Sequence, residues 1–495
     1  MALKRNVIAN YLGQGWTALM GLAFIPLYIK YLGIEAYGLI GLFAVLQAWL
    51  SLLDMGIVPT LGREMARFTA GSHSAKSIHD LLRSLETITV SFSILIGAAF
   101  WLASDWLANN WLRSENLPVD VVAQALAIMG LVAALRFCEG IYRSALIGLQ
   151  HQVWYNSAQA AIATLRFGGA VAVLAYYRPT IEAFFIWQAV VSLAALLLFV
   201  LKLRLVLPRQ ESPAVFSISA LRTVWQFASG MMGINFLKIM LTQIDKVLLS
   251  RLLSLEHFGY YMLASTVSTA LFLLIGPITQ ALYPRMVQLN ELNNQQKLIT
   301  VYHLGAQLVT VVTSAVLFVL IVFGEGVIYA WSGDIKLSNN VGPILSVLVL
   351  GSFLNGLMWM PYQCQLAHGW VKLGVVVNLV AVLLLVPAIV LLVPKYGALG
   401  AAWLWVTLNA GYVLLGIHFM HRKILPQEKW RWYWQDVAMP ALGSGSILAL
   451  ALIVEPKALT GRFEWFIFLL VTGLMAVAAA SLFSSEMRRR ICALL

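Results

Sequence analysis

Long apolar runs alternate with short polar interruptions along the whole chain. Each run holds about 20 residues, and at about 1.5 Å per residue a helix of that length crosses a hydrocarbon core of ~30 Å. The pattern predicts transmembrane helices over the segments 7–29, 37–62, 86–108, 119–143, 154–177, 182–205, 223–250, 258–283, 300–324, 340–366, 371–394, 396–420, 436–454 and 464–484. We therefore expect an all-α, polytopic membrane protein with about fourteen transmembrane helices.

Composition and charge agree with this expectation. Of the 495 residues 61% are hydrophobic and only 11% are charged, which is too little polar sequence to cover a water-facing surface. If the N-terminus is cytoplasmic, 21 of the 33 Lys and Arg residues fall on the cytoplasmic side, nine on the outer side and three within spans. The positive-inside rule then predicts that both termini are cytoplasmic. The net charge of +12 is explained by topology, so no nucleic-acid partner is expected.

Sequence signatures of enzymes and cofactor sites are absent. The chain has no GxxxxGK[ST] loop and no DxD motif, and its longest hydrophilic connection, 63–85, is too short for a catalytic domain. His418 and His421 have helical i,i+3 spacing at a predicted membrane edge, which fits either an interfacial position or, less readily, a metal site without a third ligand. We therefore expect no enzyme, no metal and no cofactor.

One polar interruption occurs twice. "YLGIEAYG" (31–38) and "LLSLEHFG" (252–259) place Glu, an aromatic residue and Gly at the same spacing, 221 residues apart. Six predicted helices separate the copies, and because six is even the two halves enter the membrane in the same direction, as in a parallel repeat. Glu35 and Glu256 are expected on a solvated outer rim. The predicted domains are an N-lobe of helices 1–6, a C-lobe of helices 7–12, and two additional helices with a basic tail: 1–210, 211–425 and 426–495.

Polar residues form stripes on the first helix of each half. Asn6, Asn10, Gln14 and Thr17 share one helical face, and so do Asn235, Lys238, Thr242 and Asp245. At the repeat offset Gln14 pairs with Asn235 and Thr17 with Lys238. The uncharged members fit hydrogen bonding between helices as well as they fit a cavity lining. Lys238 differs, because an ammonium near mid-span costs at least ~2.5 kcal/mol unless it faces water or a partner.

Further charges lie within the spans. Arg166 has no acid within helical reach, so its partner is expected from another helix or from a ligand. Arg136, Glu139 and Arg143 step by three and four, which fits a self-satisfied ion ladder or a binding role. The candidate substrate-binding residues, forming a cationic cavity, are Lys238, Arg166, Arg136, Arg143, Arg63, Arg285, Gln14, Thr17 and Asn235.

Two helices carry breaks near the predicted inner mouth. In "LLDMGIVP", Asp54 is followed by Gly56 and Pro59, and in "LLIGPITQ" Gly276 and Pro277 lie near the matching depth. A proline removes a backbone hydrogen bond and lets a helix bend, so these four Gly and Pro residues are candidate hinges. The candidate ion-coupling or gating residues are Asp54, Glu139 and Asp245.

The run "KWRWYWQD" (429–436) alternates basic and aromatic residues before the thirteenth predicted span. Such a run is typical of anchoring at the membrane interface. A contact with lipid headgroups is the alternative.

Two stretches, "ANYLGQGWTALMGLAFIPLYIKYLGIEAYG" and "LLDMGIVPTLGREMARF", together with the parallel repeat, resemble a known family. It is the polysaccharide-transport branch of the multidrug/oligosaccharidyl-lipid/polysaccharide exporter superfamily, in particular its bacterial lipid-linked oligosaccharide flippases of the O-antigen type. The resemblance implies two six-helix lobes around a central cavity that open alternately to each side of the inner membrane. It implies transport of an undecaprenyl-diphosphate-linked glycan to the periplasmic leaflet, driven by a proton or sodium gradient, for lipopolysaccharide or other surface polysaccharide.

Partners and alternatives follow from the same resemblance. Besides the lipid-linked glycan, the implied partners are membrane lipids and the polymerase and chain-length regulator of the same pathway. A cation-coupled multidrug exporter of the same superfamily is one alternative, although the interior of this chain is net basic. A membrane glycosyltransferase or ligase is the other, although the outer connections are short.

Overall fold

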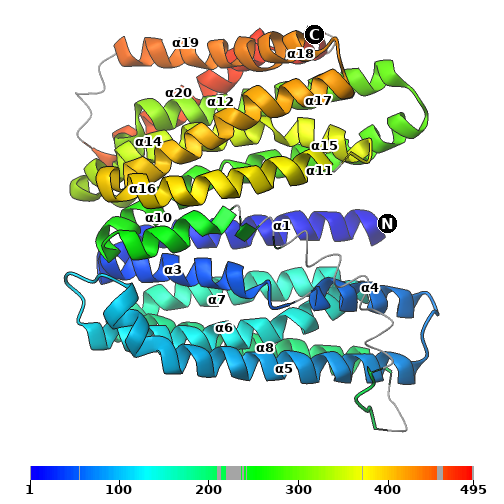
Figure 1. Ribbon diagram of the computed structural model, residues 1–495, viewed down its shortest axis with the longest axis vertical. Coiled ribbons are helices and arrows are strands. Elements are labelled where there is room, and N and C mark those ends of the chain that lie inside the picture. The colour runs from blue at the N-terminus through cyan, green and yellow to red at the C-terminus, as the bar shows by residue number, and fades with distance from the viewer. Residues whose placement is uncertain are drawn as a thin grey trace. The chain divides into compact units, whose positions relative to one another are not determined.

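The computed structural model describes the larger part of the chain (Figure 1). The described residues are 2–54, 56–208, 213–218, 236, 239–240, 242–370, 372–453 and 461–492. Every regular element in these ranges is a helix. The chain divides into two compact units, Met1–Gly259 and Tyr260–Leu495.

The first unit contains the elements α1 (Ala2–Ala23), α2 (Ile25–Leu32), α3 (Ile34–Leu50), α4 (Ile57–Thr69), α5 (Ala75–Trp106), the π-helical turn η1 (Leu107–Trp111), α6 (Val119–Gly148), α7 (Gln152–Tyr176) and α8 (Ile181–Val206). Helix α10 (Leu255–Thr269) begins in this unit. Its long helices run side by side as a bundle (Figure 1).

The second unit contains α11 (Phe272–Glu291), α12 (Gln295–Val322), α13 (Gly324–Ser332), α14 (Ile335–Leu357), α15 (Trp359–Ala367), α16 (Lys372–Gly411), the π-helical turn η2 (Tyr412–Gly416), α17 (Ile417–Lys423), α18 (Lys429–Arg431), the π-helical turn η3 (Trp432–Ala438), α19 (Met439–Ile453), α20 (Arg462–Phe483) and α21 (Ser485–Cys492).

The expected spans correspond closely to these helices. Among the described residues, eleven helical segments are long and apolar enough to cross a membrane, and Ile34–Leu50 is a shorter apolar helix. The stretch Lys372–Lys423 bends at Gly397, whose φ is 59°, so it holds two expected spans joined without a loop. The seventh expected span, 223–250, lies mostly outside the described residues, although 242–252 are helical. The prediction of an all-α, polytopic membrane protein is confirmed.

Each unit is organised around one central helix. In the first unit α6 packs against α3, α4, α5, α7 and α8, and in the second α12 packs against α11, α14, α19, α20 and η3. Close approach needs small residues: a Cβ on Gly443 of α19 would lie 2.8 Å from the carbonyl oxygen of Ala479 in α20. Large apolar side chains such as Trp101 and Leu102 of α5 point outward, with 68% and 73% of their surface exposed. This outward display suits a lipid environment.

The repeated turn has a structural role in the first unit. Helices α3 and α10 begin at Ile34 and Leu255, which are equivalent positions of the repeat, 221 residues apart. Their glycines meet at a close crossing, because a Cβ on Gly38 would lie 2.6 Å from the carbonyl oxygen of Leu255, and one on Gly259 would collide with the carbonyl oxygen of Ile34. The two copies of the motif therefore pack directly on each other.

The expectation of a solvated Glu35 is wrong. Its side chain is only 5% exposed, and its carboxylate accepts hydrogen bonds from the backbone N–H groups of Glu115, Asn116 and Leu117 at 2.5, 2.9 and 3.2 Å. Three donors from one loop compensate the cost of burying the charge. Sequence reasoning missed this role because the partners are backbone groups some 80 residues away.

Candidate functional site

Buried cations gather in the first unit around α6 and α7. Arg136 of α6 donates from Nη1 to Gln47 Oε1 at 2.9 Å, from Nη2 to Gln188 Oε1 at 2.7 Å and from Nε to Ser192 Oγ at 3.3 Å. Its guanidinium carbon lies 5.2 Å from the ring centroid of Phe43. All of these partners are uncharged. The hydrogen-bonding needs of Arg136 are satisfied, but its positive charge is not neutralised.

Arg166 of α7 is the least satisfied of these cations. Its side chain is 11% exposed, and Nη2 lies 3.8 Å from Glu139 Oε2 of α6, which is an ion-pair distance but longer than a hydrogen bond. Among the described residues neither Nε nor Nη2 has a hydrogen-bond partner. The expectation that the charged partner of Arg166 comes from another helix is confirmed. One edge of the guanidinium nevertheless stays open.

The predicted ion ladder along α6 does not satisfy itself. Glu139 is 6% exposed and pairs with Arg166, while Arg136 turns to α3 and α8. Arg143, exposed on the same helix, lies near Asp54 and Tyr155. The three arginines and Glu139 therefore belong to a network that joins several helices of the first unit.

Asp54 lies where the second predicted span breaks. The chain leaves helical geometry between α3 and α4, where Gly56 has a φ of 75°, and Asp54 Oδ1 accepts a hydrogen bond from the N–H of Val58 at 2.7 Å. A side-chain acceptor at this point satisfies an otherwise free donor of the first turn. Pro59 follows within that turn of α4. A break at this position was expected, while hinge motion and ion coupling remain predictions.

The corresponding break in the second half lies elsewhere. Helix α10 ends at Thr269 and α11 begins at Phe272, so the interruption precedes Gly276 and Pro277, which both lie within α11. Gly276 has open space around it. The hinge role of this pair remains a prediction.

The polar stripe of α1 serves partly as an attachment between helices. Asn10 Nδ2 donates to Gln152 Oε1 at 3.2 Å, and Asn156 Nδ2 donates to Asn10 Oδ1 at 2.5 Å, so Asn10 fastens α1 to α7. Thr17 Oγ1 donates to its own helix at the carbonyl of Gly13, and Gln14 is exposed. Of the two alternatives for these residues, hydrogen bonding between helices holds for Asn10.

The remaining predicted residues are dispersed or not described. Lys238 and Asn235 lie outside the described residues. Asp245 has Lys246 Nζ 3.4 Å from its carboxylate. Arg63 is half exposed, with Nη1 3.8 Å from Glu64 Oε1, and Arg285, in the second unit, donates to Gln288 Oε1 at 2.5 Å.

The second unit holds a buried polar cluster that the sequence did not indicate. His303 of α12 is fully buried, with Nδ1 2.5 Å from Asp436 Oδ2 and Nε2 2.9 Å from Glu428 Oε2. Each ring nitrogen therefore lies within hydrogen-bonding distance of a carboxyl oxygen. Gln307 Nε2 donates to Asp436 Oδ1 at 2.8 Å, and Arg431 Nη1 lies 3.4 Å from Glu428. Every member of this cluster has a partner.

His421 belongs to the same region, and its expected interfacial position stays a prediction. The ring is fully buried, and Nε2 lies 3.2 Å from the hydroxyl oxygen of Tyr302. His418 points elsewhere, with Nδ1 3.0 Å from Lys429 Nζ. Within the described ranges no group of three or more His, Cys, Asp and Glu residues has an arrangement suited to a metal ion.

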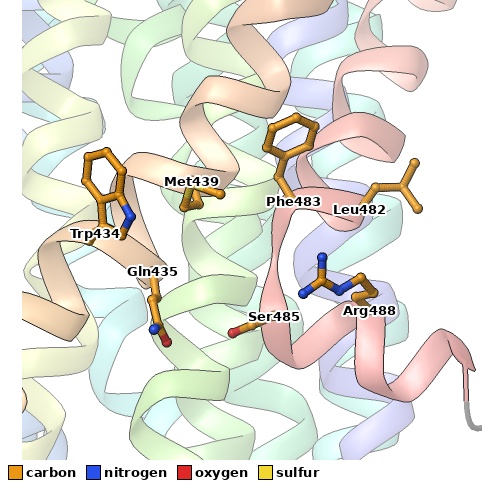
Figure 2. Close-up of a pocket in the computed structure, with 7 residues that line it drawn as sticks. All are labelled: Trp434, Gln435, Met439, Leu482, Phe483, Ser485 and Arg488. Atoms are coloured by element: carbon orange, nitrogen blue, oxygen red, sulfur yellow. The ribbon is translucent and has the colours of Figure 1, made fainter.

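A pocket opens beside this cluster, between the η3–α19 segment and the α20–α21 segment (Figure 2). Its volume is about 380 Å³. The residues that line it are Trp434, Gln435, Met439, Leu482, Phe483, Ser485 and Arg488. The amide, hydroxyl and guanidinium groups lie toward one end in the view, and the apolar side chains lie toward the other (Figure 2).

Comparisons with known proteins identify relatives. Residues 3–290 match the family described as polysaccharide biosynthesis protein. A protein of Shigella flexneri named "Putative O-antigen transporter" is 19% identical over 408 residues, which cover 82% of this chain and 94% of that protein.

Solved structures with the same fold include two transporters. The lipid II flippase MurJ, in an inward closed conformation, matches with a TM-score of 0.68 and 14% identity over 98% of this chain and 99% of that chain. An inward-facing multidrug resistance MATE family transporter of the MOP superfamily matches with a TM-score of 0.64 and 14% identity over 83% of this chain and 96% of that chain. The family match covers more than half of the sequence. The chain, a multi-pass membrane protein that shares the fold of both solved structures, therefore belongs to the polysaccharide biosynthesis protein family.

Proposed function

We propose that this transporter flips an undecaprenyl-diphosphate-linked oligosaccharide from the cytoplasmic to the periplasmic leaflet of a bacterial inner membrane. The observation that carries the proposal is Arg166, a nearly buried guanidinium whose Nε and Nη2 have no hydrogen-bond partner among the described residues. These two N–H groups form one edge of the guanidinium fork. Such an edge binds a phosphate or carboxylate through two parallel hydrogen bonds.

The charge around Arg166 favours an anion. Arg136, Arg143 and Arg166 face Glu139 and Asp54, so this network carries one more positive than negative charge. A cation within a span costs at least ~2.5 kcal/mol on insertion scales, and a diphosphate ligand would offset that cost. The further residues proposed for substrate binding are Lys238, Asn235, Gln14, Thr17, Arg143, Arg63 and Arg285.

Family and relatives support the class of substrate. Membership in a polysaccharide biosynthesis family and similarity to a protein named as an O-antigen transporter both favour a lipid-linked glycan. The fold shared with two solved transporters favours transport over the glycosyltransferase or ligase alternative. The proposed topology has both termini in the cytoplasm, because that orientation places most Lys and Arg residues inside.

Transport is proposed to proceed by alternating access of two lobes, 1–210 and 211–425, driven by a proton or sodium gradient. Asp54, Glu139 and Asp245 are the proposed coupling groups. Gly56, Pro59, Gly276 and Pro277 are the proposed hinges, since helix interruptions let segments rotate. Membrane lipids and the polymerase and chain-length regulator of the same pathway are the proposed partners.

Complementation tests the role of Arg166. A strain without its own copy of this gene would express the wild type, Arg166→Gln, Arg166→Lys or Arg178→Gln, and surface glycan would be quantified at matched protein level. Arg178 is the control because it is an exposed arginine just beyond α7. We expect Arg166→Gln to lower export at least tenfold, Arg166→Lys to retain part of it, and Arg178→Gln to be normal.

Two outcomes would contradict the proposal. The first is wild-type export by Arg166→Gln at normal protein level. The second is a phenotype in cationic-drug resistance with unchanged surface glycan, which would favour the multidrug exporter.

A further inference from the structure

The pocket between η3–α19 and α20–α21 combines one cation with apolar walls. Gln435, Ser485 and Arg488 supply the polar end, and Met439, Leu482 and Phe483 supply the apolar side chains (Figure 2). At about 380 Å³ it has the size of a site for a small molecule or for part of a lipid. Trp434 and Gln435, near the end of the basic and aromatic run 429–436, belong to the lining of this pocket.

Two arginines of α21, Arg488 and Arg489, have described side chains. Of these two, only Arg489 forms an ion pair with an acidic residue. Arg489 donates to Glu486 Oε1 at 3.2 Å, and Arg431 lies 3.9 Å from the same carboxylate. Glu428 is held by His303 and Arg431. Because the described acids around the pocket are engaged elsewhere, Arg488 gives the pocket a net positive charge.

A rigid polar network supports the wall behind Arg488. Ser485 Oγ accepts a hydrogen bond from Gln307 Nε2 at 3.1 Å, and Gln307 Oε1 accepts from Ser484 Oγ at 2.5 Å and from the N–H of Glu486 at 2.9 Å. Gln307 and Ser484 are fully buried. The start of α21 is therefore fixed on α12, and a ligand would meet a preorganised surface.

The exposed aromatic and apolar groups around the pocket are typical of residues at a membrane boundary. Trp430 and Trp434 are 74% and 62% exposed, one helical turn apart, as in the aromatic belts of membrane proteins. Leu482 and Phe483 are 58% and 44% exposed, so the apolar end is open to its surroundings. A small free anion would leave these apolar walls uncovered, and a neutral lipid would leave Arg488 unpaired.

We propose that this pocket binds one anionic diacyl phospholipid of the surrounding membrane. The phosphate lies against Arg488 and the Ser485 hydroxyl, and an acyl chain covers Met439, Leu482 and Phe483. This site is additional to the transport site, since it requires neither Arg166 nor a substrate. With cytoplasmic termini the lipid belongs to the cytoplasmic leaflet, where anionic headgroups attract basic segments.

The proposal can be tested by native mass spectrometry of the full-length protein, released from detergent micelles. Phosphatidylglycerol, phosphatidylcholine and glycerol 3-phosphate would be titrated separately. The wild type is expected to retain one phosphatidylglycerol in preference to phosphatidylcholine. Arg488→Gln is expected to weaken that binding about fivefold, the effect of one cation near a headgroup. Arg489→Gln makes the same charge change on the next residue, whose side chain is paired with Glu486, and is expected to bind as the wild type does.

Three results would overturn the proposal. Equal losses in Arg488→Gln and Arg489→Gln would indicate diffuse charge attraction without a site. Displacement of phosphatidylglycerol by glycerol 3-phosphate would indicate a site for a free anion. Preferential displacement by undecaprenyl phosphate would assign the pocket to the transported lipid. The thermal unfolding temperature of each variant is the control for folding. It is expected to be unchanged because Arg488 and Arg489 are both exposed.

Discussion

Two groups of buried charges, one in each unit, differ in how they are satisfied. In the first unit Arg166 keeps two guanidinium N–H groups without partners, and its carboxylate neighbour Glu139 stays at 3.8 Å. In the second unit His303 lies between Asp436 and Glu428 at 2.5 and 2.9 Å. Since an unpaired buried polar group is costly, the first arrangement fits the proposed anion-binding role and the second fits a structural role.

The difference also separates the tasks of the two groups. The His303 cluster fastens α12 to the segment of α18 and η3, and through Gln307 it also fastens α12 to α21. These contacts attach the C-terminal helices to α12 within the second unit. On the proposed function, the open donors of Arg166 would instead bind a ligand that arrives and departs.

The largest expected effect is on stability in the second unit. Asp436→Ala removes the partner of His303 and of Gln307, so it leaves buried polar groups uncompensated. We expect the free energy of unfolding to fall by about 3–5 kcal/mol. Denaturant or SDS titration in micelles measures this loss. A fall below about 1 kcal/mol would show that the cluster is not a fastening.

The next effect separates stability from transport in the first unit. Arg166→Gln leaves Glu139 buried without its cation, so we expect a loss of about 2 kcal/mol in unfolding free energy together with loss of export. Arg166→Gln with Glu139→Gln removes both charges and should recover most of the stability but none of the export. The same titration and the surface-glycan assay measure both. Recovery of export in the double variant would mean that Arg166 serves only to balance Glu139.

The sequence predicted the helices well because an apolar run of membrane length has few other structures available to it. It also predicted that a charge such as Arg166 needs a partner from outside its own helix. It could not predict Glu139 as that partner, because a helical repeat at i,i+3 and i,i+4 favours pairing along α6.

The His303 cluster could not be predicted from the sequence, for a related reason. Its members, His303, Glu428 and Asp436, are separated by up to 133 residues, and Asp436 ends a run that fits simple interfacial anchoring. Nothing in the spacing places these groups together. The one available signal was a histidine and a carboxylate within predicted spans, where every ionisable group needs a partner.

A smaller effect tests the repeated turn. Gly38→Ala places a methyl group 2.6 Å from the carbonyl oxygen of Leu255, so α3 and α10 must separate locally. We expect a loss of about 1–2 kcal/mol in unfolding free energy. Gly15→Ala is the control, since nothing lies within 4 Å of a Cβ there and alanine favours the helix. Equal behaviour of the two variants would exclude the glycine crossing as a requirement of the first unit.

The smallest expected effect on stability concerns Glu35. It tests whether a buried charge in the first unit can have a purely structural role. Glu35 has three backbone donors, so it resembles the His303 cluster in being satisfied although it lies in the same unit as Arg166. Glu35→Gln keeps one oxygen as an acceptor but removes the charge and places an amide toward N–H groups. We expect a loss of about 1 kcal/mol in unfolding free energy and normal export at matched protein level. If Glu35→Gln loses export while its stability is unchanged, a buried charge with all its hydrogen-bond partners takes part in transport. The presence of partners would then not separate structural charges from charges that act in transport.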